Sequence, residues 1–182
     1  TDDASVENAI HCWATMLYLG YFNDTIANRM AGLQSIAMRL ELKEGINHCS
    51  IINDSYNSDV NSLNIALDFL HQQNQHKKKT VILSDILQSG KNDAELYGEI
   101  ADLLKQKRIS RIIGIGAAIS KNSAVFDIEG LFYPSTADFL NKFSFAEFQH
   151  ETILLKGARI FEFVQLSQAL PQRAAEGVLE GV

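Results

Sequence analysis

Short apolar runs alternate with amphipathic segments from about residue 49 onward, and this alternation constrains the fold more than any other feature. The predicted strands cover residues 49–53, 80–84, 111–115 and 152–155, and the predicted helices cover residues 61–74, 93–107, 136–143 and 160–170. Apolar strands separated by amphipathic helices indicate a mostly parallel sheet with helices on both faces. The sequence therefore predicts an α/β, Rossmann-like domain.

The residues before this pattern form a different kind of segment. Two amphipathic helices are predicted, one over residues 5–20 and one from about Asp24. Residues 38–47 are predicted to form a strand that runs into Gly45. Two helices bury little apolar surface alone, so we expect them to complete a domain that lies largely outside this chain. The expected division is helices and hinge at 1–44, the α/β domain at 45–170, and a tail or linker at 171–182.

Composition excludes several classes of function. The 182 residues carry 16 basic and 22 acidic side chains, for a net charge of −6, which disfavours binding to nucleic acid or to a membrane surface. The basic run His76–Lys79 lies between a predicted helix and strand, and is expected to be a solvated loop. Cys12 and Cys49 fit neither a zinc pattern nor a disulfide framework. No apolar run is long enough to span a membrane, so we expect a cytoplasmic protein with reduced thiols.

A polar turn follows the first strand of the α/β pattern. It contains Asp54, whose carboxylate could accept ribose hydroxyls, Tyr56, which could stack or donate, and Asn57, which offers an amide. Ligands of open α/β sheets bind at the carboxyl ends of the strands, where this turn lies. The alternative is that the Asn, Asp and Ser residues only form the turn and cap the next helix. Both interpretations remain open from the residues alone.

Two phosphate-binding motifs are incomplete. Gly90-Lys91 lacks the earlier glycine of a P-loop, and Gly114-Ile115-Gly116 lacks the third glycine of a dinucleotide fingerprint because Ile119 occupies that position. No helix is expected directly after Gly116. Asp85, just after the second strand, is predicted to cap a helix or orient a loop, since Asp favours such positions. We therefore predict no catalytic residue and no metal site in this chain.

Four segments resemble motifs of the Mur ligases of the MurF type, in the same order and over about residues 5–170. They are Asn53-Asp54-Ser55-Tyr56-Asn57-Ser58-Asp59, Met38-Arg39-Leu40-Glu41, Val81 to Gly90, and Leu155-Lys156-Gly157-Ala158-Arg159. Members of this family join D-Ala-D-Ala to UDP-MurNAc-tripeptide with ATP and Mg²⁺. The resemblance implies the C-terminal domain, with the phosphate loop on a central domain outside this chain. This chain alone is therefore expected to be inactive.

The resemblance also implies roles for particular residues. ATP is expected to contact Asn8, Arg39, Asp54, Tyr56 and Asn57, and the dipeptide is expected to contact Lys156, Gly157 and Arg159. Met38 replaces the family's glycine and Ala158 replaces its serine. From the residues alone, Lys156 could instead be a strand-end lysine that reaches into solvent. The sequence of residues 155–163 resembles that of family members fused to an alanine racemase. Residues 171–182 would then be the start of the linker to that second enzyme.

The competing interpretation is a non-catalytic, flavodoxin- or Rossmann-like module that binds a nucleotide or a protein partner. The first 40 residues distinguish the two. A piece of a larger domain would leave its apolar helix faces partly exposed, whereas a self-contained module would bury them.

Overall fold

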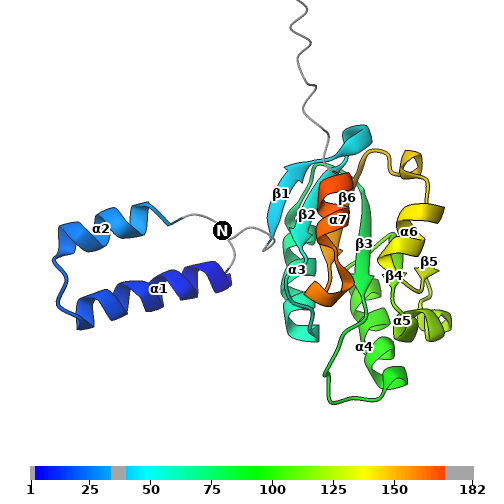
Figure 1. The fold of residues 1–182 in the computed structure, drawn as a ribbon, viewed down its shortest axis with the longest axis horizontal. Coiled ribbons are helices and arrows are strands. Elements are labelled where there is room, and N and C mark those ends of the chain that lie inside the picture. The colour runs from blue at the N-terminus through cyan, green and yellow to red at the C-terminus, as the bar shows by residue number, and fades with distance from the viewer. Residues whose placement is uncertain (1–2, 34–39, 171–182) are drawn as a thin grey trace, which may run out of the picture. The chain divides into compact units, whose positions relative to one another are not determined.

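The computed structural model describes residues 3–33 and 40–170, with side chains from residue 6 onward. The chain divides into two compact units, residues 1–36 and residues 37–182. The division lies before the first strand, earlier in the chain than the glycine at which a boundary was expected. Figure 1 shows the elements of both units.

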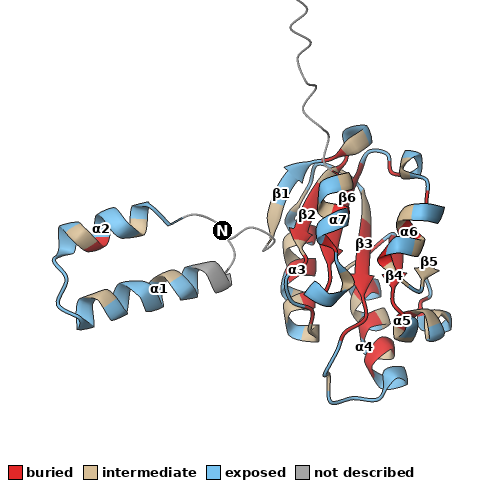
Figure 2. Ribbon diagram, in the orientation of Figure 1, coloured by how far each residue is buried: buried red, intermediate tan, exposed pale blue. Residues whose placement is uncertain are grey.

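The first unit is a pair of helices, α1 (Asp3–Tyr18) and α2 (Asn23–Ala31). Gly20, at a φ of 78°, turns the chain after α1, and its amide donates to the carbonyl of Leu17. Four apolar side chains of α1 lie on one face, spaced four, three and four residues apart, and are 41–54% exposed: Val6, Ile10, Trp13 and Leu17. Ile26 is buried, but most described residues of this unit are exposed (Figure 2).

The second unit is built on a sheet whose order is β1-β2-β6-β3-β4-β5 among the described residues. The strands are β1 (Glu41–Glu44), β2 (Ser50–Asp54), β3 (Lys78–Ser84), β4 (Arg111–Ile115), β5 (Glu129–Tyr133) and β6 (Glu151–Lys156). β1 pairs antiparallel with β2, and the other neighbours are parallel. The last strand in sequence therefore lies in the middle of the sheet, between β2 and β3.

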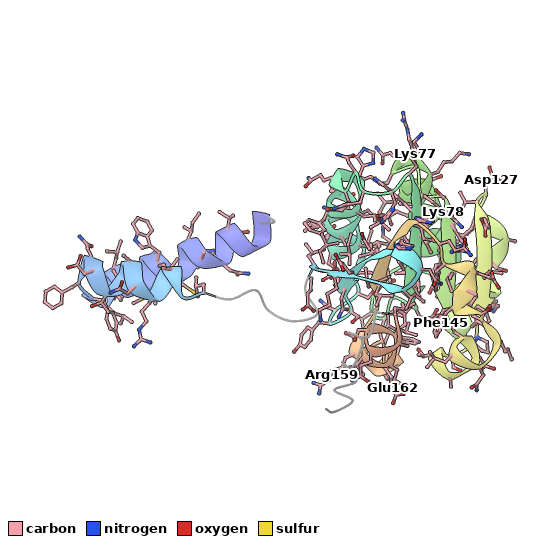
Figure 3. The ribbon with its side chains drawn as sticks, turned by 90° about the horizontal axis from the view of Figure 1, so that it is seen from above. Lys77, Lys78, Asp127, Phe145, Arg159 and Glu162 are labelled. Atoms are coloured by element: carbon pink, nitrogen blue, oxygen red, sulfur yellow. The ribbon has the colours of Figure 1, made fainter. Side chains whose placement is uncertain are left out.

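Helices cover both faces of this sheet. The helices are α3 (Val60–Gln72), α4 (Asp93–Gln106), α5 (Ala117–Lys121), α6 (Thr136–Lys142) and α7 (Val164–Ala169), with single 3₁₀ turns at Ile46–His48, Ser123–Val125, Phe145–Glu147 and Arg159–Phe161. One core lies under α3, α4 and α5 and includes Leu67, Tyr97 and Ile119. The other lies under α6 and α7 and includes Phe139 and Phe163. Figure 3 shows the three layers from above.

The predicted fold class is confirmed, with three local differences. β5 and α5 were not predicted, because β5 is an edge strand with two exposed residues at its start and α5 is a five-residue helix. The single helix expected over residues 160–170 is a 3₁₀ turn followed by α7, because Glu162 between them adopts a left-handed conformation at a φ of 54°. Lys78 and Lys79 begin β3 rather than ending a loop.

A buried ionic cluster ties the amino-terminal ends of four strands together. Glu151 is fully buried on β6, and its carboxylate accepts from Arg111 on β4 at 2.8 and 2.9 Å and from the Thr80 hydroxyl on β3. Arg111 also lies 3.6 Å from Glu129 on β5 and 5.1 Å from the ring centre of Phe148. A buried ion pair is costly to break because one charge is left without its partner.

Arg111→Met tests this cluster. The substitution leaves the Glu151 carboxylate buried without its guanidinium, so the free energy of unfolding should fall by about 3 kcal/mol or more. Urea unfolding measures the change. Lys105→Met is the matched control, because Lys105 pairs with Asp127 on the surface at 3.4 Å, and it should change the midpoint little. Equal effects of the two substitutions would contradict the assignment.

Candidate functional site

The candidate site lies at the carboxyl ends of the parallel strands, where β2, β6 and β3 are neighbours. Asp54 is the last residue of β2 and Lys156 the last residue of β6, and the two are paired in register. Leu83 of β3 pairs with Lys156 on the other side. The loops that follow these strands therefore leave the sheet side by side, at the edge where open α/β sheets bind ligands.

Asp54 and Lys156 form an ion pair. Lys156 Nζ donates to Asp54 Oδ2 at 2.7 Å and to the carbonyl oxygen of Asn57 at 2.7 Å. The Lys156 side chain is 2% exposed and that of Asp54 is 13% exposed. A lysine that reaches into solvent would show the opposite pattern. The interpretation of Lys156 as a solvated strand-end lysine is therefore wrong.

The loop after Asp54 is ordered by its own side chains. The Ser55 hydroxyl donates to Asn53 Oδ1 at 2.6 Å, and Asn57 Oδ1 accepts from the Ser58 amide at 2.9 Å. Asp59 caps α3 by accepting from the Ser62 amide at 2.9 Å, and the Ser62 hydroxyl completes a capping box. The turn-and-cap interpretation is therefore correct for part of this loop.

The charge of Asp59 is stabilised by its surroundings. Burial acts to raise the pKa of Asp59, but the hydrogen bonds from Ser62 and the positive charge of Lys156 outweigh burial and lower it. The carboxylate therefore stays ionised to a lower pH than that of an ordinary aspartate. The loop carries two carboxylates, Asp54 and Asp59, close to one buried ammonium.

Some side chains of this loop face solvent. Tyr56 is 49% exposed, and Asn57 is exposed although its carbonyl and amide groups order the loop. Next to the partly accessible Asp54 carboxylate, an aromatic ring can stack on a ligand ring and an amide can hydrogen-bond to ligand hydroxyl groups. The predicted site residues of β2 are therefore brought together at one edge.

The loop after β6 lies next to them. A side chain on Gly157 would meet the ring of Phe163 at 2.6 Å, so close packing against this ring explains why the position holds glycine. The Ala158 amide donates to the Ser84 hydroxyl at 3.0 Å, which ties the loop to the end of β3. Arg159 is exposed and lies on the α7 side of the sheet (Figure 3).

Asp85 orients two loops, as predicted. Its buried carboxylate accepts from the Tyr97 hydroxyl at 3.0 Å and from the amides of Ala118 and Ile119 at 3.1 and 2.7 Å. Burial, and then the charge and hydrogen bond of Asp85, raise the pKa of Tyr97. The carboxylate thus joins the loop after β3 to α4 and to the start of α5.

A helix does open directly after Gly116, contrary to expectation. α5 begins at Ala117, and its first free amides are already bound by Asp85. Gly116 has a φ of 140°, and a side chain there would overlap the Asp85 carboxylate. This helix start therefore has an internal carboxylate where a dinucleotide-binding helix would bind phosphate.

Two further predicted site residues precede the strands of this edge in the sequence. Asn8 is exposed on α1, in the first unit. Arg39 lies outside the described residues; Glu41, two positions later, pairs with Asn53 in the sheet. In the part of the chain that the structure describes, no three His, Cys, Asp or Glu side chains are placed to hold a metal ion. None of the helices in the same part is long and apolar enough to cross a membrane.

Comparison with known proteins identifies the family. The model of the family "Mur ligase, glutamate ligase domain" matches residues 38–159. The chain belongs to this family. Two relatives are UDP-N-acetylmuramoyl-tripeptide–D-alanyl-D-alanine ligases: the Bacillus subtilis protein is 30% identical over 112 residues, 62% of this chain and 24% of the relative. The Escherichia coli protein is 24% identical over 169 residues, 92% of this chain and 37% of the relative.

Solved structures agree with the fold. A MurF structure from Acinetobacter baumannii has a TM-score of 0.75 at 22% identity, over 92% of this chain and 38% of that one. A Thermotoga maritima MurF ligase in complex with ADP has a TM-score of 0.60 at 15% identity, over 86% of this chain and 35% of that one. The chain thus spans about a quarter to two-fifths of the length of these relatives. The match to Mur ligases does not favour the flavodoxin-like binding module.

The contact between Lys156 and Asp54 was not predicted. Each residue was singled out, but for different ligands, because the sequence does not show that β6 inserts beside β2. The available signal was that both residues end a strand, since parallel strands end at one edge.

Gly116→Ala tests the contact with Asp85. The new methyl group would overlap the carboxylate, and the left-handed conformation is strained for alanine, so the free energy of unfolding should fall by about 2 kcal/mol or more. Gly98→Ala in α4 is the matched control. Nothing lies within 4 Å of its added methyl group, so helix propensity should stabilise the protein by roughly 0.5–1 kcal/mol. Thermal unfolding measures the change in stability of both variants. If both substitutions stabilise or both destabilise the protein, the assigned contact between Gly116 and Asp85 is contradicted.

Proposed function

We propose that this chain is the C-terminal, substrate-closing part of an ATP-dependent peptidoglycan-precursor ligase. The reaction adds D-Ala-D-Ala to UDP-MurNAc-tripeptide. ATP phosphorylates the tripeptide carboxylate, the dipeptide amine attacks the acyl phosphate, and inorganic phosphate leaves. The family match over residues 38–159 carries this proposal, together with two ligase relatives that name this reaction.

The loop after β2 is assigned to ATP. Asp54 accepts hydrogen bonds from the ribose hydroxyls, and Tyr56 and Asn57 lie beside this contact. Support comes from their position at one edge, with the Asp54 side chain accessible at 13% and the Tyr56 ring half exposed. Arg39 and Asn8 are assigned to the same nucleotide, whose phosphates and Mg²⁺ are held by a central domain.

The loop after β6 is assigned to the incoming dipeptide. D-Ala-D-Ala carries a free carboxylate, for which a cation is the simplest partner. Arg159 is exposed and is assigned the first contact, and Lys156 lies behind it at the strand end with two of its three donors in use. Gly157 contributes backbone between them. The enzyme is assigned to the cytoplasm, where nucleotide-linked precursors and ATP are available.

The helical unit is assigned to the end of the central domain of the same enzyme, and the segment that follows it is assigned to the hinge between the two domains. The exposed apolar stripe of α1 supports this assignment, since a self-contained module would bury it. Residues 171–182 are assigned to a tail or linker. That linker is proposed to lead to a downstream alanine racemase, because the sequence of residues 155–163 resembles that of the fused family members.

The proposal predicts no turnover by this chain alone. No P-loop motif is present in its sequence, and acyl-phosphate chemistry needs that loop and Mg²⁺ to hold the transferred phosphoryl group. ATP-dependent phosphate release is measured with UDP-MurNAc-tripeptide and D-Ala-D-Ala, for this chain and for the full-length enzyme. Release by the full-length enzyme only is expected; release by the chain alone would contradict the division of the site.

A second prediction concerns Asp54. In the full-length enzyme, Asp54→Ala should lower kcat/KM for ATP by about 5- to 150-fold, equivalent to the ~1–3 kcal/mol of a hydrogen bond to a charged group. Asp138→Ala is the matched control, because Asp138 pairs with Lys142 on α6 and is not assigned to the site. Unchanged ATP kinetics in Asp54→Ala would argue against the ribose contact.

A further inference from the structure

Lys156 is the most deeply buried charged side chain of the candidate site, and its ammonium is already occupied. It lies 2.7 Å from both Asp54 Oδ2 and the Asn57 carbonyl oxygen. We propose that Lys156 is a positioning residue, which holds the loop Asp54–Asp59 in its ligand-facing conformation and acts on the nucleotide through Asp54. The identity of the nucleotide rests on the proposed function, whereas the holding of the loop does not.

One ammonium fixes the loop at two points. Asp54 is the end of β2 and Asn57 is three residues later, so both bonds of Lys156 close one short turn of backbone onto β6. Asn57 in turn accepts from the Ser58 amide, and Asp59 then caps α3. Hydrogen bonds therefore fix several residues along the loop between the end of β2 and the start of α3.

The distribution of charge also supports a positioning role for Lys156. Two carboxylates, Asp54 and Asp59, share the field of this single buried cation, and Lys156 helps to lower the pKa of Asp59. Without the ammonium, the largely buried Asp54 carboxylate would be left without its cation, Asp59 would lose the attraction of a positive charge, and the Asn57 carbonyl would lose its donor. The loop should then move outward, which would displace Asp54 and Tyr56 together.

The same geometry disfavours a first contact between Lys156 and the dipeptide. A substrate carboxylate would have to approach a cation that is 2% exposed and already neutralised by Asp54. A third negative charge at this point would meet two carboxylates as well as one ammonium. Arg159, exposed in the neighbouring loop, has no such neighbours among the described contacts.

The first test measures the loop in the 182-residue chain. Lys156→Met should speed amide hydrogen exchange at Ser58 and Ser62 by at least about tenfold, because the bonds of these amides depend on the closed loop. Amides of β6, such as that of Leu154, should keep their protection. Lys142→Met is the matched control: its pair with Asp138 has the same 2.7 Å distance but lies on the surface of α6.

Asp54→Asn provides a second variant in case Lys156→Met does not fold. It removes one charge of the pair and should also speed exchange at Ser58, and the double variant should show no further increase beyond the larger single effect. Unchanged exchange at Ser58 and Ser62 in the folded variants would overturn the proposal.

The second test measures kinetics in the full-length enzyme. Lys156→Met should raise the KM for ATP at least fivefold and leave the KM for D-Ala-D-Ala within about twofold, as Asp54→Asn should. The reverse split, with only the dipeptide KM raised, would overturn the positioning role and indicate direct contact with the dipeptide. If the wild-type enzyme shows no ligase activity, the proposed function fails, and the exchange experiment still decides whether Lys156 holds the loop.

Discussion

The ion pair between Asp54 and Lys156 is the interaction on which the site depends. Its partners are 102 residues apart in sequence, and they meet only because β6 inserts between β2 and β3. The insertion also brings the loop after β6 against the end of β3, where Ser84 accepts from the Ala158 amide. A late strand at the centre of the sheet therefore assembles one ligand edge from three distant segments.

The two edges of the sheet use charge differently. At the amino-terminal edge, Arg111 and Glu151 are both almost fully buried and neutralise each other, so they can join strands but cannot meet a ligand. At the carboxyl edge, the cation is buried while Asp54 remains partly accessible and Tyr56 faces solvent. A buried charge that orients an accessible one suits a site that must be rigid before its ligand arrives.

The sequence predicts what depends on local pattern and misses what depends on strand order. The apolar runs of β2, β3, β4 and β6 are buried on both faces of the sheet, which makes them visible as continuous apolar segments. β5 is half exposed at an edge and has no such run. Asp85 was correctly expected to orient a loop, because its residue type favours that role. The partner of Lys156 is set by which strands are neighbours, and no local pattern contains that information.

The proposed division of the reaction between two domains follows from the kinds of contact that these loops can make. Every contact proposed for the β2 and β6 loops is with the nucleoside part of ATP or with the dipeptide, and none is with the phosphoryl group that is transferred. A domain with these contacts alone can select and orient, but it needs a second surface to supply the phosphate loop. The apolar stripe of α1, exposed along Val6, Ile10, Trp13 and Leu17, supports the proposal that such a surface belongs to the same enzyme. Under the proposed function, closure of the two domains would exclude water from the acyl phosphate, and nucleotide-orienting groups on the closing domain would couple ATP binding to that protection.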